Sequence, residues 1–385
     1  MLKELAELEV SAKQCQRVTQ RIGAERVAQR EARVKAYEQL PLPQQQQPAP
    51  AAPAGDWKHR VATVLVDGGR AQVRDERWGQ PQPPGSRRSW WREPKAAALI
   101  TFQSQASEQD PLPEIPACLL DSLWIVPLLQ DLKHSRASGS PPASPSDPSA
   151  ASAVAASPPP APAEDDPKRW SPEPLVRSVV ATFDDYEHLG RLARVEAYHR
   201  NFHQAPRKAF LGDGHLANWG LHAREFPDYV AIVDLLHALS YVYRAAREST
   251  PDLSACWQRY RRWATLVWQG RVSEWLPELT AEAARGGDSQ GPLQECLTYL
   301  EHNASRMRYA DYRRQGLPIT TARMESTIKQ LNRRMKGSEK FWDAGGEPQL
   351  QLCADRLSDT NPLDAFWTRH PTTRTGFRKP QAKLH

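Results

Sequence analysis

The sequence has few cysteines, and they stand far apart. They form no CxxC pair and show no zinc-type spacing. Their number is odd and the gaps between them are long, so neither a disulfide framework nor a zinc-binding cysteine motif organises the fold. The five cysteines are Cys15, Cys118, Cys256, Cys296 and Cys353.

Long apolar runs are also missing. No stretch approaches the roughly 20 apolar residues that a membrane-spanning helix requires. The first ten residues, M-L-K-E-L-A-E-L-E-V, are amphipathic and acidic and lack the apolar core of a signal peptide. We therefore expect a soluble, cytoplasmic protein that has no membrane partner.

Proline, tryptophan and positive charge are abundant instead. The 385 residues include 34 prolines, which cluster and so indicate linkers, and 13 tryptophans, several of them beside Arg or Lys. An apolar fraction of 39% permits a globular core, and the length suits one large or two ordinary domains. The formal charge of +6 is compatible with a nucleic-acid partner but does not prove one.

Composition divides the chain into segments. Residues 1–40 are predicted to be helical, with a break near residues 8–11 and a second helix from Ser11 that ends before Gly23. This outline fits either a helix-turn-helix or an ordinary helical hairpin. Linkers are expected at residues 41–56 and 136–168, the second of them Ser/Pro/Ala-rich and disordered. The final segment, residues 346–385, is predicted to be irregular.

Between the linkers the pattern predicts an α/β fold with a mixed sheet. Residues 61–66 are almost wholly apolar, as expected of a strand that is buried on both faces. Residues 71–74 and 95–102 are predicted to complete a three-stranded meander. Further strands are expected at residues 208–211 and 229–233, and a strand or a helix lead-in at residues 176–183. Helices are expected at residues 185–202, at 215–225 and from residue 234 onward.

Residues 322–342, A-R-M-E-S-T-I-K-Q-L-N-R-R-M-K-G-S-E-K-F-W, carry the clearest pattern. Met324, Ile328, Leu331 and Met335 recur at helical spacing and form one apolar stripe. Glu325 lies beside the stripe near the helix N-terminus, where the helix dipole favours an ionised carboxylate. Cations follow it at helical spacing. The pattern fits a solvated helix with an ordinary Glu–Lys pair, and it also fits a site that holds a metal ion against a phosphate backbone.

Three carboxylates lie at the ends of these expected elements. Asp67 ends the first strand, Asp213 follows the strand expected beside it, and Glu325 begins the late helix. Ligands of open α/β sheets gather at strand ends, so the three side chains could converge there, and three carboxylates suit two Mg²⁺ ions. Each carboxylate also has a structural explanation: a turn for Asp67, an Asx-turn for Asp213 and a helix surface for Glu325.

Three blocks of residues resemble the DDE-type transposases of bacterial insertion sequences, in particular the ISKra-like group. The first block is V-D-G-G-R at residues 66–70 with W-R-E-P-K at 91–95. The second runs from L-G-D-G at residues 211–214 to I-V-D-L-L-H-A at 232–238, and the third from G-L-P-I at 316–319 to Trp342. The blocks stand in family order over residues 1–40 and 56–345. The D-x-x-H at residues 234–237 matches the signature of that group.

The resemblance implies an RNase H-like catalytic domain, formed by residues 57–135 and 169–237, with a mostly helical, DNA-contacting insertion at 238–320. A catalytic helix would follow within residues 321–345. The resemblance implies that Asp67, Asp213 and Glu325 are the catalytic triad and bind two Mg²⁺ ions, for which Mn²⁺ can substitute. His237 would be the signature histidine, although a histidine satisfied in the core fits equally well. The implied DNA-binding cations are Arg70, Lys329, Arg333, Arg334 and Lys336.

The implied activity is Mg²⁺-dependent DNA strand cleavage and strand transfer by a homo-oligomer bound to transposon ends and target DNA. The chain departs from the family pattern in its short N-terminal region and in its Pro-rich segment inside the catalytic domain. An alternative is therefore an N-terminally truncated, non-autonomous derivative that binds DNA as a regulator or is a decayed copy. A third reading is an unrelated RNase H-like nuclease.

Overall fold

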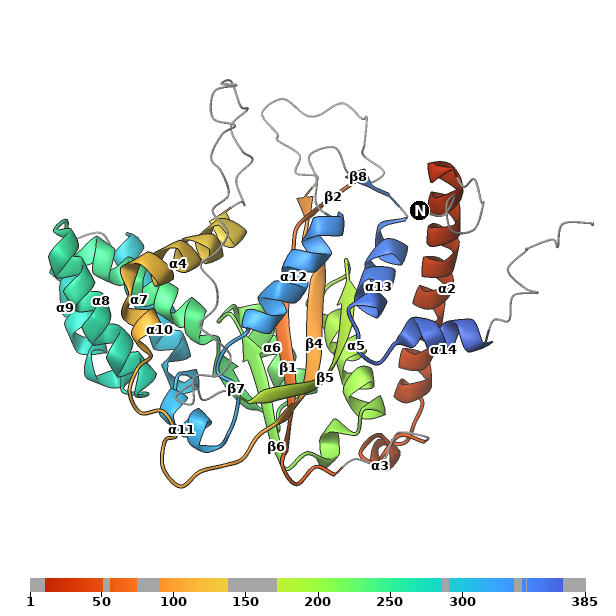
Figure 1. Ribbon diagram of the computed structural model, residues 1–385, viewed down its shortest axis with the longest axis horizontal. Helices are drawn as coiled ribbons and strands as arrows, with labels where there is room; N and C mark the ends of the chain where they lie inside the picture. The colour runs from red at the N-terminus through yellow and green to blue at the C-terminus, as the bar shows by residue number, and fades with distance from the viewer. Residues whose placement is uncertain are drawn as a thin grey trace, which may run out of the picture.

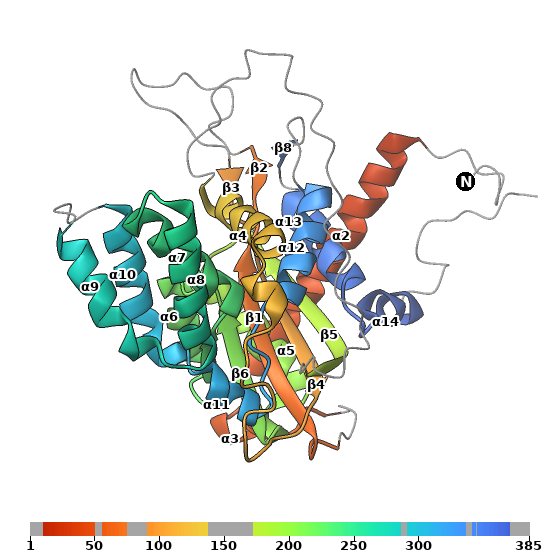
Figure 2. The same cartoon turned by 60° about the vertical axis from the view of Figure 1, so that its left-hand side comes forward.

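A computed structural model describes residues 11–50, 56–74, 91–137, 172–285, 291–335, 341–343 and 345–369, without the side chains of residues 130–137, 323, 325 and 341. A central sheet separates two groups of helices (Figure 1). One group covers the sheet, and the other forms a helical bundle to one side (Figure 2). No helix in these ranges is long and apolar enough to cross a membrane.

The central sheet has five strands in the order β5-β4-β1-β6-β7. The pairs β1·β4 and β4·β5 are antiparallel, whereas β1·β6 and β6·β7 are parallel. The mixed α/β sheet predicted from the sequence is therefore confirmed. The strands are β1 (Arg60–Gly68), β4 (Lys95–Gln103), β5 (Glu173–Thr182), β6 (Arg207–Gly212) and β7 (Val230–Val233).

The predicted meander has a different second strand. Residues 71–74 do not pair with β1; instead β2 (Ala71–Val73) joins β3 (Trp91–Arg92) and β8 (Phe341–Trp342) in a separate small sheet. β4 takes the place beside β1 because its nine residues are largely apolar and pair with β1 along its whole length. β5, which lies beyond the long linker, is the third strand of the meander. The sequence allowed either a strand or the start of a helix at residues 176–183, and the structure has a strand there.

The second helix of the possible helix-turn-helix is present, but it continues past its predicted end at Gly23. Helix α2 (Ala12–Glu38) runs without interruption, and Ser11 caps it through a capping box with Gln14, as the capping prediction at Ser11 required. Gly23 does not end this helix. A Cβ at Gly23 would lie 2.5 Å from the carbonyl oxygen of Pro348, so glycine allows α2 to approach α13 closely. Residues 1–10, where the first helix was expected, lie outside the described residues.

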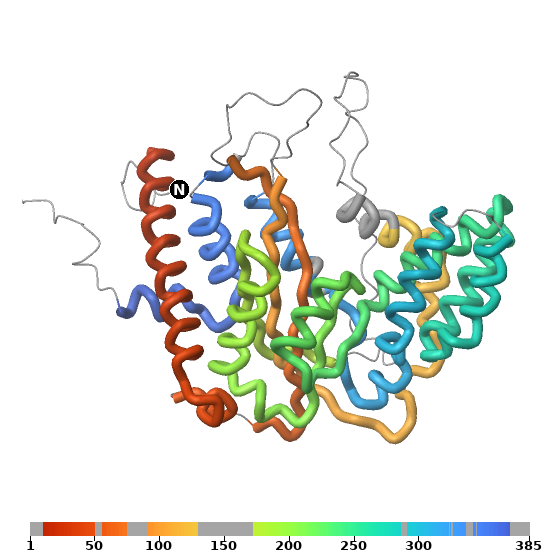
Figure 3. The backbone as a smooth tube through the Cα atoms, turned by 180° about the vertical axis from the view of Figure 1, so that it is seen from behind, coloured from red at the N-terminus to blue at the C-terminus, as the bar shows by residue number. Residues whose placement is uncertain are grey.

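Two helices replace the irregular C-terminal segment over residues 346–369. Helices α13 (Gly346–Arg356) and α14 (Pro362–Arg369) pack against the rest of the fold, and α13 lies along α2 (Figure 3). The loop between them covers the outer edge of β5, because Asp359 N–H donates to the Arg177 carbonyl at 2.8 Å and Val179 N–H donates to Ser358 Oγ at 2.9 Å. An edge strand protected in this way is unavailable for pairing with another chain. Residues 370–385 lie outside the described residues.

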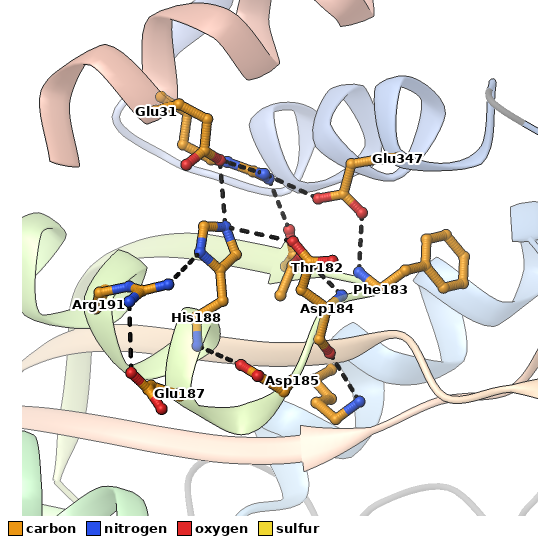
Figure 4. Close-up of polar contacts among 12 residues, drawn as sticks. Glu31, Thr182, Phe183, Asp184, Asp185, Glu187, His188, Arg191 and Glu347 are labelled. Atoms are coloured by element: carbon orange, nitrogen blue, oxygen red, sulfur yellow. Dashed lines mark hydrogen bonds and ion pairs between the residues drawn. The ribbon is translucent and has the colours of Figure 1, made fainter. Parts of the chain in front are cut away.

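Charged side chains fasten α2 and α13 to the C-terminal end of β5 (Figure 4). Glu347 on α13 accepts from the backbone N–H of Phe183 at 2.8 Å and from Arg30 on α2 at 2.9 Å. His188 Nε2 lies 3.2 Å from Glu31 Oε1, which ties α2 to α5 (Tyr186–His199) as well. The N-terminal helix and the C-terminal segment therefore belong to the sheet domain.

The expected helical insertion is confirmed as helical. The insertion contains α7 (Leu235–Ser249), α8 (Leu253–Trp268), α9 (Leu276–Arg285), α10 (Pro292–Asn303) and α11 (Tyr309–Arg314). Helix α4 (Ser122–Ala137) also packs against α7, which the sequence had not indicated. Trp263 and Trp275 stack 4.9 Å apart and are fully buried, so these aromatic side chains form the bundle core.

The remaining elements lie at the connections. Residues 41–50 of the first predicted linker are ordered, and Ala49 is buried against α2 and α5. Residues 51–55, and residues 138–171 of the second linker, lie outside the described residues. The other helices are α3 (Leu42–Gln45), α6 (Leu216–Glu225), α12 (Ala322–Met335) and the 3₁₀ turns η1 (Ala117–Leu120), η2 (Phe202–Gln204), η3 (Val272–Glu274) and η4 (Ala304–Arg306).

We expect Arg26→Ala to lower the free energy of unfolding by about 3 kcal/mol, because it leaves a buried carboxylate without its cation. Arg26 donates to both carboxylate oxygens of Asp355, at 2.8 and 3.2 Å, and both residues are buried. Urea unfolding followed by circular dichroism measures the change. The matched control is Arg17→Ala, an exposed arginine on the same helix, for which a change within about 0.5 kcal/mol is expected. Equal effects would contradict the role given to the buried pair.

Candidate functional site

Asp67 is the next-to-last residue of β1, and Asp213 directly follows β6, the parallel strand beside it. Leu65 on β1 pairs with Leu211 on β6, and each aspartate lies two residues beyond its leucine. Side chains two residues apart point to the same face of a strand, and neighbouring strands run about 5 Å apart. Both carboxylates are partly exposed. The sheet thus brings these two predicted residues to the same edge and to the same face.

Short-range contacts fix the Asp213 side chain. Its Oδ1 accepts from the backbone N–H of His215 at 2.9 Å and from Asn218 Nδ2 at 2.8 Å. The predicted Asx-turn is therefore present, and it holds one carboxylate oxygen in a fixed direction. Asn218 lies on α6, which starts directly after the turn, so the helix orients the carboxylate.

The helical insertion also holds the Asp213 turn. The hydroxyl of Tyr299 on α10 donates to the Asp213 carbonyl at 2.8 Å. The ring of Tyr299 fills the space where a Cβ at Gly214 would lie, and Gly214 has a φ of +92°. Glycine is required there by both the close contact and the backbone conformation. Asn303, buried at the end of α10, accepts from Trp219 Nε1 at 2.9 Å and so links the same turn to α6.

Asp67 is the next-to-last residue of β1, which continues through Gly68, and residues 69–70 connect it to β2 without the predicted turn. Its Oδ1 accepts from the N–H of Gly68 at 2.7 Å. The side chain of Glu93 lies against Gly68, and that of Asn332 lies against Gly69, so both glycines are in contact with side chains from other elements. The end of β1, the β3–β4 connection and α12 therefore meet at these two glycines, next to Asp67.

Helix α12 lies across this edge of the sheet. Its predicted apolar stripe is confirmed, since Met324, Ile328, Leu331 and Met335 are all buried. Near its C-terminal end, Asn332 Oδ1 accepts from the backbone N–H of Arg70 at 3.1 Å. This bond fastens the C-terminal end of α12 beside the connection that follows β1. Helix α12 lies in front of the sheet in Figure 1.

A buried Asp–His pair fastens the start of α12 to the neighbouring strands. Asp234 follows β7, and its N–H donates to the carbonyl of Gly212, the residue before Asp213, at 2.9 Å. Its Oδ1 accepts from the N–H of Thr321, just before α12, at 2.5 Å. Its Oδ2 accepts at 2.9 Å from the backbone N–H of His237, whose Nδ1 lies 2.8 Å away from the same oxygen. The D-x-x-H pattern thus links β6, α7 and α12.

The same contacts keep Asp234 ionised. Full burial by itself would raise the pKa of this carboxyl group. The hydrogen bond and charge of His237, together with the N–H groups of Thr321 and His237, outweigh burial and hold the pKa below its ordinary value of 3.8. His237 is itself buried beside Asp234. Its observed contact is therefore with a carboxylate that positions α12, and its predicted catalytic role stays a prediction.

Glu325 is the fourth residue of α12, one turn after Thr321. Its side chain lies outside the described residues, so convergence of the full triad stays a prediction. Among the described side chains, no three His, Cys, Asp or Glu residues form a group able to hold a metal ion. Asn218 Oδ1, beside Asp213, is buried and accepts no hydrogen bond from the described residues. Two carboxylates and a spare amide oxygen are hard oxygen ligands, and this donor set fits Mg²⁺.

Predicted DNA-binding cations lie around this edge. The guanidinium of Arg70 stacks 5.1 Å from the centre of the Trp91 ring. On α12, Lys329, Arg333 and Arg334 are exposed. Lys336 lies outside the described residues. Three of the predicted cations are thus exposed on α12, and their role in binding DNA stays a prediction.

Comparison with known proteins provides no family for this chain. No family model matches it, and no curated protein is similar enough to count as a relative. The functional argument therefore depends on the arrangement of the residues described above.

Sequence reasoning missed the residues that position the carboxylates. Asn332 and Asn218 stood inside segments that the sequence had singled out, but polar side chains between cations or beside a turn give no pattern of their own. Tyr299 and Asn303 lie more than 80 positions after Asp213, and nothing in their own segment points to it. The one signal available was Gly214, because a glycine directly after Asp213 is typical of a positive φ or of a close approach by another side chain.

Asp234→Ala is expected to lower the free energy of unfolding by about 3 kcal/mol at neutral pH, because it removes a buried charge from its partners. The folded pKa lies below 3.8, so this contribution is present above the unfolded pKa and is lost as the pH falls through the folded pKa. The difference between wild type and variant should be constant from about pH 5 to 8 and should shrink below about pH 4. Urea unfolding at a series of pH values measures it.

The control for this experiment is Asp252→Ala. Asp252 also caps a helix, α8, but it is exposed. Its loss should cost about 1 kcal/mol. A difference between wild type and Asp234→Ala that stays constant down to about pH 2 would refute the ionised, buried pair.

Proposed function

We propose that this protein is a DDE-type transposase, which cleaves DNA strands and transfers them in a Mg²⁺-dependent reaction. The observation that carries the proposal is that the pairing of β1 with β6 brings Asp67 and Asp213 to one edge of the sheet, while Glu325 belongs to the first turn of α12, which packs on β1. A single aspartate at a strand end is an ordinary turn former. Two at the ends of paired strands, one of them oriented by Asn218 on α6, support a shared metal site.

The topology supports an RNase H-like assignment for the sheet domain. Three antiparallel strands, β1, β4 and β5, are followed by the parallel strands β6 and β7. Asp67 lies at the C-terminal end of β1 and Asp213 directly after β6, on the side where open α/β sheets bind their ligands. The helical bundle enters between β7 and α12, which is the place that the resemblance assigns to the family's insertion.

In this proposal Asp67, Asp213 and Glu325 hold the metal ions, which can be Mg²⁺ or Mn²⁺. Two such ions, when bound, lower the barrier to attack by water or a 3′-hydroxyl on a phosphodiester and stabilise the leaving oxygen. The protein contributes the fixed directions of the ligands. Asn218 and the backbone of the Asp213 turn orient one carboxylate, and Asp234 holds the beginning of the helix that carries Glu325.

The DNA backbone would lie against the cationic surface formed by Arg70, Lys329, Arg333 and Arg334. Arginine and lysine bind phosphates without reading sequence, so these residues would position the strand at the carboxylates. The same contacts make binding strongly salt-dependent, because each neutralised phosphate releases counterions. Transposon ends and target DNA are the proposed partners. A homo-oligomer would hold two ends together.

Strand transfer tests the proposal directly. Purified protein, Mg²⁺ and a supercoiled target plasmid are combined with a duplex from the DNA that flanks the coding sequence, cut to expose a 3′-hydroxyl. The wild type is expected to join the duplex to the plasmid. Asp213→Asn should lower the yield more than about 100-fold, since loss of outer-shell partners alone costs about 10- to 100-fold at metal sites.

The matched control is Asp228→Asn. Asp228 is an exposed aspartate two residues before β7, whereas Asp213 follows the other end of β6. Asp228 Oδ2 lies 2.7 Å from Lys208 Nζ. This variant should retain wild-type transfer. Equal transfer by wild type and Asp213→Asn would rule out the proposed role of the carboxylate. DNA binding without transfer by the wild type would favour the alternative, a non-autonomous DNA-binding derivative.

A further inference from the structure

A cavity lies at the N-terminal end of β1, away from Asp67. It has a volume of about 780 Å³ and is bordered by α2, the start of β1, the exposed half of β5, α5 and the loop after α13. Trp57 and Arg60 line it. Asp67 is ten residues farther along the chain, most of them in one extended strand that rises about 3.3 Å per residue. The cavity is thus separate from the carboxylate edge.

Guanidinium groups dominate the lining. Five arginines and only two carboxylates contribute to it. Two of the arginines, Arg26 and Arg30, are engaged by Asp355, Glu31 and Glu347. The other three are Arg33, Arg60 and Arg200.

These three arginines have little opposing charge. Arg33 is 45% exposed, and its contact with Glu196 is long, at 3.4 Å. The side chain of Arg60 makes no hydrogen bond or ion pair within the described part of the chain. Arg200 donates only to neutral oxygens, among them Ser178 Oγ at 3.0 Å and Thr101 Oγ1 at 2.7 Å. Positive charge therefore exceeds negative charge inside the cavity.

Burial makes the positive charge of Arg200 costly. Burial lowers the pKa of Arg200 to about 10, because Glu196 and Asp359 offset only part of the cost of burying its charge. His199 also lines the cavity and carries no negative charge. Burial and the charge of Arg33 lower its pKa. An anion in the cavity would restore the balance of charge around Arg200.

An aromatic and aliphatic wall faces the arginines. Leu175 and Val176 on β5 are each 39% exposed, which is unusual for large apolar side chains of this sheet. Trp57 packs edge-on against Phe202, with ring centres 5.9 Å apart. The indole N–H of Trp57 is buried and finds no acceptor among the described residues. The cavity offers hydrogen-bond donors beside apolar surface.

We propose that this cavity binds a small organic phosphate, with the phosphate oxygens on Arg33 and Arg60, the buried charge of Arg200 beside them, and the organic part against Trp57, Leu175 and Val176. The planar guanidinium group of arginine can donate two parallel hydrogen bonds to the oxygens of one phosphate. The volume lies within the roughly 300–1,000 Å³ that is typical of small-molecule sites, whereas a polynucleotide would need an extended groove. A nucleotide combines both parts of this chemistry. The proposal does not depend on the transposase activity.

Isothermal titration calorimetry of the full chain with ATP, without added metal, tests the site. ATP should bind with one-to-one stoichiometry, and inorganic phosphate should compete with it. The double variant Arg33→Gln/Arg60→Gln should weaken ATP binding about tenfold or more, because it removes two charged donors. Neither side chain braces the fold, whereas Arg200 does, so thermal unfolding should be unchanged. Arg285→Gln, an exposed arginine on α9 outside the cavity, should bind ATP as the wild type does.

In a second titration, a single-stranded oligonucleotide of twelve nucleotides is tested for binding and for competition with ATP. The proposal is supported if ATP binding depends on Arg33 and Arg60 and the oligonucleotide does not compete at equal phosphate concentration. It is overturned if the wild type does not bind ATP, if phosphate fails to compete, or if the double variant binds ATP unchanged. Binding of the oligonucleotide alone, weakened in the double variant, would assign the arginines to a polynucleotide and also overturn it.

Discussion

The register between β1 and β6 is the constraint on which the candidate site depends. Pairing of Leu65 with Leu211 places Asp67 and Asp213 at the same height and on the same face of the sheet. A slip of one residue would turn one carboxylate to the opposite face. That slip is opposed by the burial of both strands, since six of the nine residues of β1 and four of the six residues of β6 are buried. The hydrophobic core therefore sets the geometry of two charged groups at its edge.

Elements far apart in the sequence then brace this edge. The turn of Asp213 is held by α6 and by Tyr299 from the helical bundle. Asp234 links the end of β7 to the beginning of α12, and Asn332 links α12 to the connection after β1. The bundle and the late helix thus act on the carboxylates through single, directed hydrogen bonds. Such bonds orient ligands without adding charge to the site.

The sequence predicted those features that have a local physical cause. The apolar run of β1, the stripe of α12 and the cap at Ser11 all appear as expected, because periodicity and capping are properties of neighbouring residues. Predictions that required a choice between distant partners were less successful. Residues 71–74 formed a separate small sheet, because the longer and more apolar β4 pairs better with β1. Gly23 looked like a helix end, yet Pro348, more than 300 residues away, is the reason for the glycine.

Divalent-metal binding tests the central claim most directly, namely that Asp67 and Asp213 belong to one metal site. Mn²⁺ titration followed by electron paramagnetic resonance counts the bound ions and gives their affinity without any need for a DNA substrate. The account predicts that Asp67→Asn and Asp213→Asn each weaken the same site about tenfold or more, whereas Asp228→Asn leaves it intact. Unchanged Mn²⁺ binding in either of the first two variants would contradict the shared site.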